Sequence, residues 1–299
     1  MWEPTLIAQT ANTVIATLAS LVLNGYVTYR ILTNHNNLTN YQNLLVGQAA
    51  LYIFGSVICL VANERMNLQM EYMVGYPFVT LNYAAEVSIK CLLDDTQIAQ
   101  ECLLMIFNVH RVLIFLRPVL LTRFHVVITP VVLLYLCLRT VLTIFNDDIG
   151  GYTTYGFFLC AIVIVSVCYL ILRRHFRVSR YSKRVRTMQT KLSNGLLMQL
   201  AVHVVFFAAF TIGGPIFTLL AVWFEFDGET FTTVVAVYYM VFYMIFAWYP
   251  VMICMIIKWS ISGFLTTKGP SAKVAVEPAI HKTGRTGELP RSCRFSASF

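Results

Sequence analysis

The chain has 299 residues, of which 58% are hydrophobic and 12% are charged, and its mean hydropathy is +0.69. A soluble domain has about 25% charged residues, so this composition argues against a soluble globular protein and favours a membrane protein. The net charge of +8 does not indicate a nucleic-acid partner, because the basic residues gather in particular segments between apolar runs and therefore indicate membrane topology.

Seven stretches are long and apolar enough to cross the hydrocarbon core as helices, which takes about 20 residues. The third combines an apolar run with a more polar stretch before it, and we predict one long, tilted helix whose outer half faces water or protein. In chain order, the predicted spans are residues 6–29, 44–62, 82–116, 124–145, 156–172, 196–224 and 232–257. The predicted fold is an all-α membrane protein, with a seven-transmembrane helix bundle at residues 1–260.

The distribution of charge predicts the orientation of the spans, because Lys and Arg concentrate on the cytosolic side of membrane proteins. If the N-terminus is outside, the basic clusters all fall in inner segments, and Arg65 is the only basic residue in the outer loops. We therefore predict an external N-terminus and a cytosolic C-terminus. Residues 261–299 are rich in Pro, Gly, Ser and charge, which predicts a disordered basic cytosolic tail.

The third span carries a polar face, because Glu86, Lys90 and Asp94 are spaced four residues apart. Ionisable groups inside a span are costly unless they face protein or water. Two interpretations are open: ion pairs along the helix, or a polar ligand pocket near the outer leaflet. Tyrosines of the seventh span either pack or face the same ligand. The candidate ligand-binding residues are Lys90, Asp94, Asp95, His203, Tyr239 and Tyr243.

Arg111 lies about two turns inside the Arg117-Pro118 end of the third span, a depth at which an unpaired guanidinium is costly. We predict a partner from another helix, although a side chain that reaches the headgroups is the simpler alternative. The basic loop predicted at residues 173–191 orients the chain, binds anionic lipid and could contact a cytosolic protein. The candidate switch and coupling residues are Asn108, Arg111, Arg184, Arg186 and Lys191.

Two proline positions predict weak points in the last two spans. Gly213-Gly214-Pro215 should kink or loosen the sixth span, and Pro250 follows an aromatic run in the seventh. Proline removes a backbone hydrogen bond and its ring clashes with the preceding turn. The candidate hinge residues are therefore Gly213, Gly214, Pro215 and Pro250.

Enzyme chemistry has little support in the sequence. There is no phosphate-binding loop, no His-Glu-x-x-His motif and no Gly-x-Ser-x-Gly motif, so we expect no catalytic residue, cofactor or metal. An intramembrane enzyme would have to rely on Asp94 and His203. The eight cysteines include no Cys-x-x-Cys pair, and whether Cys91 and Cys160 form a disulfide is left open.

The combination of seven spans, an external N-terminus, a deep arginine in the third span and a basic segment before the sixth resembles a G-protein-coupled receptor. Two motifs of the rhodopsin-like class are replaced. Asn108-Val109-His110-Arg111 stands where Asp/Glu-Arg-Tyr would be expected, and Tyr249-Pro250-Val251 stands where Asn-Pro-x-x-Tyr would be expected. Residues 186–199 (Arg-Thr-Met-Gln-Thr-Lys-Leu-Ser-Asn-Gly-Leu-Leu-Met-Gln) and the Arg117-Pro118 ending are similar to the nematode serpentine chemoreceptors of the Str/Srd/Srh group. The resemblance covers about residues 5–260, and these two motifs are its specific part.

This resemblance implies an external small molecule or peptide bound between the outer halves of the helices, with signalling through a heterotrimeric G protein. It also implies a plasma-membrane location, in sensory cilia for a nematode chemoreceptor. Arg111 would act as the switch, and residues 173–191 would contact the G protein. The neutral Asn108 departs from the acidic neighbour that such an arginine usually has, which leaves an ionic lock without its partner.

A membrane transporter or ligand-gated channel is the alternative, because the polar face of the third span could line a permeation path. The odd number of spans and the lack of an internal repeat argue against a transporter. Insect-type olfactory receptor channels also have seven spans, but their N-terminus is inside, which is opposite to the charge distribution here.

Overall fold

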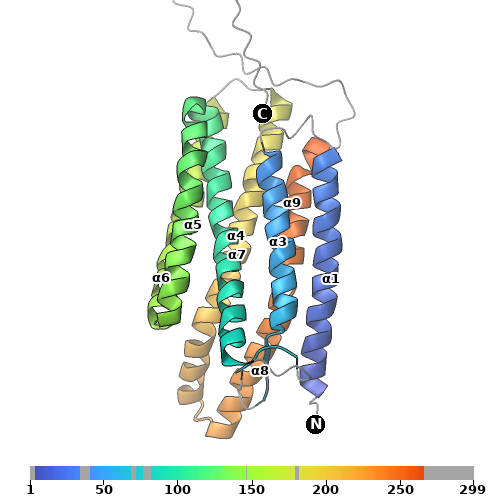
Figure 1. Ribbon diagram of the computed structural model, residues 1–299, viewed down its shortest axis with the longest axis vertical. Coiled ribbons are helices and arrows are strands. Elements are labelled where there is room, and N and C mark those ends of the chain that lie inside the picture. The colour runs from blue at the N-terminus through green and yellow to red at the C-terminus, as the bar shows by residue number, and fades with distance from the viewer. Residues whose placement is uncertain are drawn as a thin grey trace, which may run out of the picture. The chain divides into compact units, whose positions relative to one another are not determined.

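The computed structural model describes residues 4–33, 41–68, 72–76, 82–145, 147–178 and 182–265. Seven helices in this part of the chain are long and apolar enough to cross a membrane, which confirms the predicted seven-span architecture. Figure 1 shows them as a bundle. The helices are α1 (Pro4–Thr33), α3 (Gln42–Ala62), α4 (Tyr83–Leu116), the short 3-10 turn η1 (Pro118–Leu120), α5 (Leu121–Phe145), α6 (Asp147–Val178), α7 (Lys183–Trp223), α8 (Gly228–Phe246) and α9 (Tyr249–Leu265). The last two together form the seventh span.

The third span is one continuous helix, α4, as predicted. Asn82 caps its start, since the side-chain Oδ1 accepts a hydrogen bond of 2.8 Å from the backbone N–H of Ala85. Glu86 in the first turn interacts favourably with the helix dipole. The helix ends directly before Arg117-Pro118, because a residue that precedes proline disfavours the helical conformation.

Burial places α4 at the centre of the bundle and α5 at its periphery. In the most apolar stretch of 18 residues of each span, 44% of the stretch is buried in the third span and only 6% in the fourth. The exposed side chains of α5 are large and apolar, among them Val126, Val131 and Leu134. Figure 1 shows α5 and α6 at the edge of the bundle opposite α1. This exposed surface suits contact with lipid tails.

Small polar residues join α1 to α3. The hydroxyl oxygens of Ser20 and Ser56 lie 2.7 Å apart in a buried position, and Thr17 donates to the backbone oxygen of Ser56. Lipid tails provide no hydrophobic drive between helices, so close packing of small residues and hydrogen bonds between them hold such pairs together.

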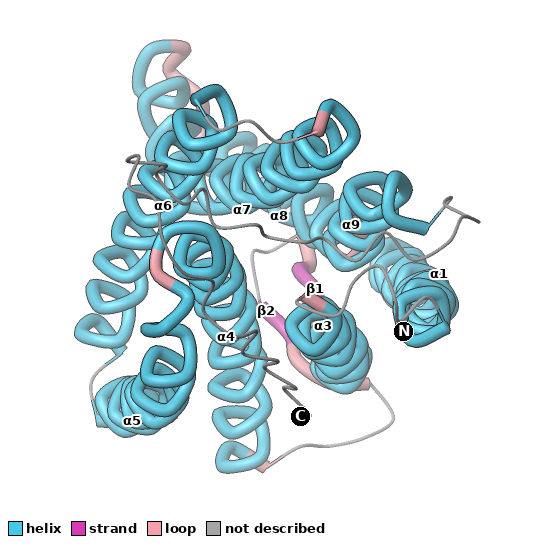
Figure 2. The backbone as a smooth tube through the Cα atoms, turned by 90° about the horizontal axis from the view of Figure 1, so that it is seen from above, coloured by secondary structure: helices cyan, strands magenta, loops and turns pink. Residues whose placement is uncertain are grey.

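A hairpin that was not predicted connects α3 to α4. Its strands, β1 (Arg65–Met66) and β2 (Tyr72–Met73), are antiparallel, and Figure 2 shows them between the surrounding helices. The side-chain amide of Gln9 in α1 pairs with the backbone of Met66, donating over 3.0 Å and accepting over 3.1 Å. We call this end of the bundle the hairpin end, and the end where α6 passes into α7 the basic end.

Arg65, the one basic residue expected in the outer loops, holds the hairpin connection together. Its side chain is buried and donates to the backbone oxygens of Gly75 at 2.6 Å and Asn63 at 3.3 Å. Burial lowers its pKa, because removal of water disfavours the charged form. The position of Arg65 therefore has a local structural explanation.

The basic segment at residues 173–191 is helical on both sides of a short connection, so the prediction of a loop there was wrong. α6 continues to Val178, and α7 begins at Lys183 instead of at residue 196. Ser182 caps α7 by accepting a hydrogen bond from the N–H of Val185 at 3.3 Å. Hydropathy marks where a helix enters the membrane, whereas this cap determines where the helix begins.

The seventh span breaks where Pro250 predicted a weak point. α8 ends at Phe246 and α9 begins at Tyr249. The N–H of Trp248 donates to Ile245, which leaves the oxygen of Met244, its regular helical acceptor, free for another donor. Asn12 of α1 takes this place: its Nδ2 donates to the oxygen of Met244 at 2.8 Å, and its Oδ1 accepts from Trp248 Nε1 at 3.0 Å.

At Gly213-Gly214-Pro215, by contrast, α7 continues without interruption. A Cβ atom added at Gly213 would overlap the ring of Tyr238, and one at Gly214 would lie 3.1 Å from the hydroxyl of Tyr239. The two glycines thus let the aromatic side chains of α8 approach the backbone of α7.

Candidate functional site

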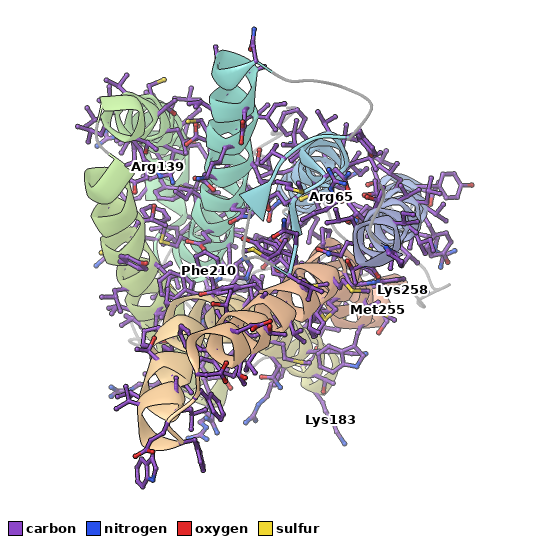
Figure 3. The ribbon with its side chains drawn as sticks, turned by 90° about the horizontal axis from the view of Figure 1, so that it is seen from below. Arg65, Arg139, Lys183, Phe210, Met255 and Lys258 are labelled. Atoms are coloured by element: carbon purple, nitrogen blue, oxygen red, sulfur yellow. The ribbon has the colours of Figure 1, made fainter. Side chains whose placement is uncertain are left out.

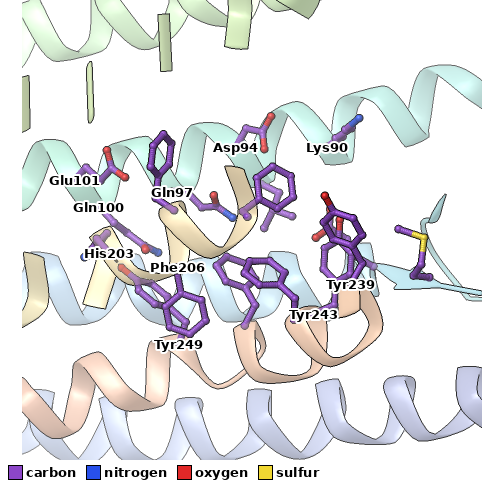
Figure 4. Close-up of a pocket in the computed structure, with 17 residues that line it drawn as sticks. Lys90, Asp94, Gln97, Gln100, Glu101, His203, Phe206, Tyr239, Tyr243 and Tyr249 are labelled. Atoms are coloured by element: carbon purple, nitrogen blue, oxygen red, sulfur yellow. Dashed lines mark hydrogen bonds between the residues drawn. The ribbon is translucent and has the colours of Figure 1, made fainter. Parts of the chain in front are cut away.

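A cavity of about 500 Å³ lies between α4, α7 and α8 near the hairpin end (Figure 4). This volume is within the range of small-molecule sites, about 300–1,000 Å³. α4 forms a polar wall, and α7 and α8 form an aromatic wall. Glu64 before β1, Met66 of β1 and Tyr249 of α9 complete the lining. The lining consists of Glu64, Met66, Lys90, Leu93, Asp94, Gln97, Gln100, Glu101, His203, Phe206, Phe207, Phe210, Tyr239, Phe242, Tyr243, Phe246 and Tyr249.

Five of the six candidate ligand-binding residues line this cavity: Lys90, Asp94, His203, Tyr239 and Tyr243. The spacing of the polar face placed Lys90 and Asp94 on the side of α4 that lines the cavity, because residues three, four and seven apart share a face. The same spacing includes Gln97 and Glu101, which sequence analysis did not assign to the site. It also missed the phenylalanines of α7, because an apolar residue in a span carries no signal that separates a cavity wall from a lipid contact.

Asp95, the sixth candidate, does not line the cavity and instead faces α5, so its assignment to the pocket was wrong. Adjacent residues of a helix point about 100° apart. The carboxylate of Asp95 accepts from Arg139 Nη1 at 2.7 Å and from the hydroxyl of Thr140 at 2.5 Å. Both of its oxygens are therefore engaged by α5.

Arg139 links three helices behind the polar wall of the cavity (Figure 3). It is 4% exposed, and its Nε and Nη2 each donate to the hydroxyl of Thr154 in α6 at 3.2 Å. Its Nη2 also lies 3.6 Å from Asp94 Oδ2, which is too long for a hydrogen bond. Sequence analysis missed Arg139, although a lone arginine in an apolar run calls for an anionic partner on a neighbouring helix.

His203 and Tyr249 line the end of the cavity that lies deepest in the bundle, and both side chains are buried. Nδ1 of His203 lies 2.8 Å from the backbone oxygen of Gln199, so in a neutral imidazole Nδ1 carries the proton. Nε2 then accepts from the hydroxyl of Tyr249, the first residue of α9. The side chain of Gln199 accepts from Gln48 of α3 at 2.7 Å. These contacts tie α7 to α3 and to the break in the seventh span.

Arg111 is fully buried toward the basic end and has the partner on another helix that was predicted. Its Nη2 donates to Ser193 Oγ at 2.9 Å, to Gln189 Oε1 at 3.1 Å and to the backbone oxygen of Gln189 at 3.2 Å. All three acceptors belong to α7 and are uncharged. Asn108 donates within its own helix, to the backbone oxygen of Leu104 at 2.9 Å.

The other basic candidates near this end differ in their surroundings. Lys191 donates to the hydroxyl of Ser262 at 2.6 Å and lies 5.1 Å from the ring centre of Trp259, so it ties α7 to α9. Arg186 is exposed, and the side chain of Arg184 lies outside the described residues. Cations in the first turns of a helix oppose its dipole, so helix stability does not account for the basic residues at the start of α7.

Cys91 and Cys160 are both free thiols, which answers the question that the sequence left open. Over the described ranges, no group of three or more His, Cys, Asp or Glu side chains is arranged to hold a metal ion. Asp94 and His203 line the same cavity, but both ring nitrogens of His203 have hydrogen-bond partners.

Comparisons with protein-family models, with curated proteins and with solved structures find no match. The fold and the site define a multi-pass bundle of seven helices suited to a membrane, with a half-polar, half-aromatic cavity toward one end and a buried arginine contact toward the other.

Proposed function

We propose that the protein is a G-protein-coupled receptor, most similar to the nematode serpentine chemoreceptors. It binds an external small molecule or peptide in the cavity and signals through a heterotrimeric G protein at the basic end. Its N-terminus is outside and its C-terminus is cytosolic. The protein lies in the plasma membrane and, as a nematode chemoreceptor, in that of sensory cilia. One observation carries the proposal: the same two helices, α4 and α7, hold the cavity and the Arg111 contact.

The spacing of residues along α4 and α7 supports communication between the cavity and the Arg111 contact. Glu101 and Arg111 are ten residues apart on α4, and Ser193 and His203 are ten residues apart on α7. At a rise of 1.5 Å per residue, both separations are about 15 Å. A ligand that shifts α7 against α4 at the cavity therefore acts on the Arg111 contact through one continuous, stiff helix on each side.

The signalling step is a population shift between two packings of α7. The resting packing is stabilised by Arg111 with Ser193 and by Lys191 with Ser262. An agonist must bind the other packing more tightly, and the difference in affinity limits the response. The exposed Arg186 and its basic neighbours then offer an electropositive surface to an acidic partner.

The test combines topology with coupling. The chain is tagged at both termini and expressed in cultured cells with a promiscuous G protein and a calcium reporter, and a panel of odorants and small metabolites is applied. We expect an antibody to reach only the N-terminal tag in intact cells. We also expect Arg111→Ala to abolish the ligand-evoked increase in signalling at unchanged surface level, because it removes all three hydrogen bonds that hold the resting packing at this end, so that signalling no longer depends on the ligand.

Arg123→Ala is the matched control, since Arg123 is an exposed arginine at the start of α5. Its response should equal that of the unchanged chain. Exposure of the C-terminal tag, or a ligand-gated current that needs no G protein, would overturn the proposal in favour of a channel.

A further inference from the structure

We propose that the ligand of the cavity is a compact cation with an apolar body. Its positive group binds to Asp94 and Glu101 on the polar wall, and its apolar part packs against the aromatic wall. The inference rests on the proposed function only in taking the cavity as the ligand site, and it does not depend on coupling to a G protein.

The charges of the lining give the first argument. On α4 the lining contains two carboxylates, Asp94 and Glu101, and one ammonium, Lys90, for a formal net charge of −1. Arg139 stands behind the wall, but its charge is balanced by Asp95, at 2.7 Å. Excess charge of one sign in a partly desolvated cavity is unfavourable unless an opposite charge compensates it. A cation in the cavity supplies that charge.

Open acceptor positions on α4 give the second argument. Oε2 of Glu101 is buried and has no hydrogen-bond partner among the described residues. Asp94 Oδ2 lies 3.6 Å from Arg139 Nη2, beyond hydrogen-bond distance, and the side chain of Asp94 is 40% exposed. A carboxylate has about four lone-pair sites, so both groups retain acceptor capacity. Figure 4 shows the two carboxylates on the same helix along one side of the cavity.

The amide of Gln100, the residue before Glu101, gives an independent third argument. Gln100 is 4% exposed and lines the cavity, and its side chain makes no hydrogen bond to any other described residue. Buried polar side chains normally have a hydrogen-bond partner. Gln100 therefore indicates that a ligand places a polar group beside Glu101. The amide oxygen of Gln100 can accept a hydrogen bond from a protonated nitrogen of that ligand.

The opposite wall fits the rest of such a molecule. Phe206, Phe242, Tyr243 and Phe246 present aromatic rings to the cavity from α7 and α8. Ring faces attract cations, and their apolar area stabilises an apolar body on burial. An anionic ligand would be repelled by Asp94 and Glu101, and a neutral ligand would offer these two carboxylates no opposite charge.

The experiment uses three probes that share a phenyl ring and differ in one group: 2-phenylethylammonium, 2-phenylethanol and phenylacetate. The purified full chain is placed in nanodiscs of zwitterionic lipid, and thermal unfolding is followed at increasing probe concentration. We expect the ammonium probe to raise the unfolding temperature, with an apparent affinity at least about tenfold above that of the alcohol. Phenylacetate should give no shift.

Glu101→Gln keeps the shape of the side chain and removes its charge, and it should abolish the preference for the ammonium probe. Glu86→Gln is the matched control, because Glu86 lies on the same helix and does not line the cavity. Equal shifts from the alcohol and the ammonium probe, no shift from the ammonium probe, or an unchanged preference in Glu101→Gln would overturn the inference. The probe comparison on the unchanged chain stands even if the variant does not fold.

The outcomes separate this inference from the proposed function. Binding of the ammonium probe to a chain that never activates a G protein would support the cation site and count against the receptor. A G-protein response to a neutral ligand that is unaffected by Glu101→Gln would count against the cation site alone.

Discussion

The guanidinium of Arg111 donates a hydrogen bond of 2.9 Å to the hydroxyl of Ser193 and thereby fastens α4 to α7. Its other acceptors on α7, the side chain and backbone of Gln189, are also neutral. The contact is therefore a set of hydrogen bonds from a charged donor and not an ion pair, which agrees with the absence of an acidic residue at Asn108.

Ser193→Ala should raise basal signalling. Loss of one acceptor for a buried charged donor weakens the resting packing by about 1–3 kcal/mol, which corresponds to at least a fivefold shift of a two-state equilibrium toward the active packing (about 1.4 kcal/mol per factor of ten). Basal G-protein activity in cells without ligand is the measurement. Thr187→Ala, at an exposed position six residues earlier on α7, is the control. Basal activity that stays the same in both variants at equal surface level would contradict the role of Arg111.

Arg139→Gln should destabilise the bundle, because it leaves the carboxylate of Asp95, whose side chain is 20% exposed, without its cation. Removal of one partner of a fully buried ion pair costs about 3–5 kcal/mol, and we expect a smaller loss for this partly exposed pair. The unfolding temperature in detergent is the measurement. The double variant Arg139→Gln with Asp95→Asn should recover part of the loss, since it removes the uncompensated charge. If the double variant is as unstable as the sum of the single ones, the two residues are not coupled.

Asn12→Leu should destabilise the break in the seventh span. The substitution leaves the oxygen of Met244 and the indole N–H of Trp248 without the partner that Asn12 provides, at about 1 kcal/mol for each of these partly buried groups. Thermal unfolding of the purified chain measures the effect. Ala11→Leu is the control at the exposed neighbouring position and should leave the unfolding temperature unchanged. Equal effects at both positions would show that Asn12 does not support the break.

Gly195→Ala should lower stability, because a Cβ atom at Gly195 overlaps the hydroxymethyl group of Ser260 where α7 meets α9. Overpacking of a close contact costs about 1–3 kcal/mol. Gly25→Ala is the control, since a Cβ atom there meets nothing within 4 Å. Ser260→Gly should restore the unfolding temperature of Gly195→Ala. Failure of this rescue would argue against the close approach.

The sequence alone predicted the helices and one wall of the cavity, for identifiable reasons. Apolar length identified the seven spans, and the alternation of charge required an odd number of crossings between residues 82 and 116, which α4 provides. The helical period then assigned Lys90 and Asp94 to the cavity. Asp95 was wrongly added to the same wall, because it directly follows Asp94 and therefore points about 100° away, toward Arg139 of α5.

Other features carry too little sequence signal to be predicted. The strands of the hairpin have two residues each, too few for a detectable period. The start of α7 depends on a single serine cap beyond the apolar run. The partners of Arg111 are Gln and Ser, which occur in most spans of the chain, whereas an acidic partner would have been conspicuous.

Ligand-evoked responses in cells that contain or lack all G-protein α subunits test the central proposal most directly. The same chain is expressed in both cell lines at matched surface level, and calcium and membrane current are recorded as the ligand is applied. We predict a response in the cells with G proteins that disappears in the cells without them. A current of equal size in both cell lines would contradict the receptor account and assign the cavity to a channel.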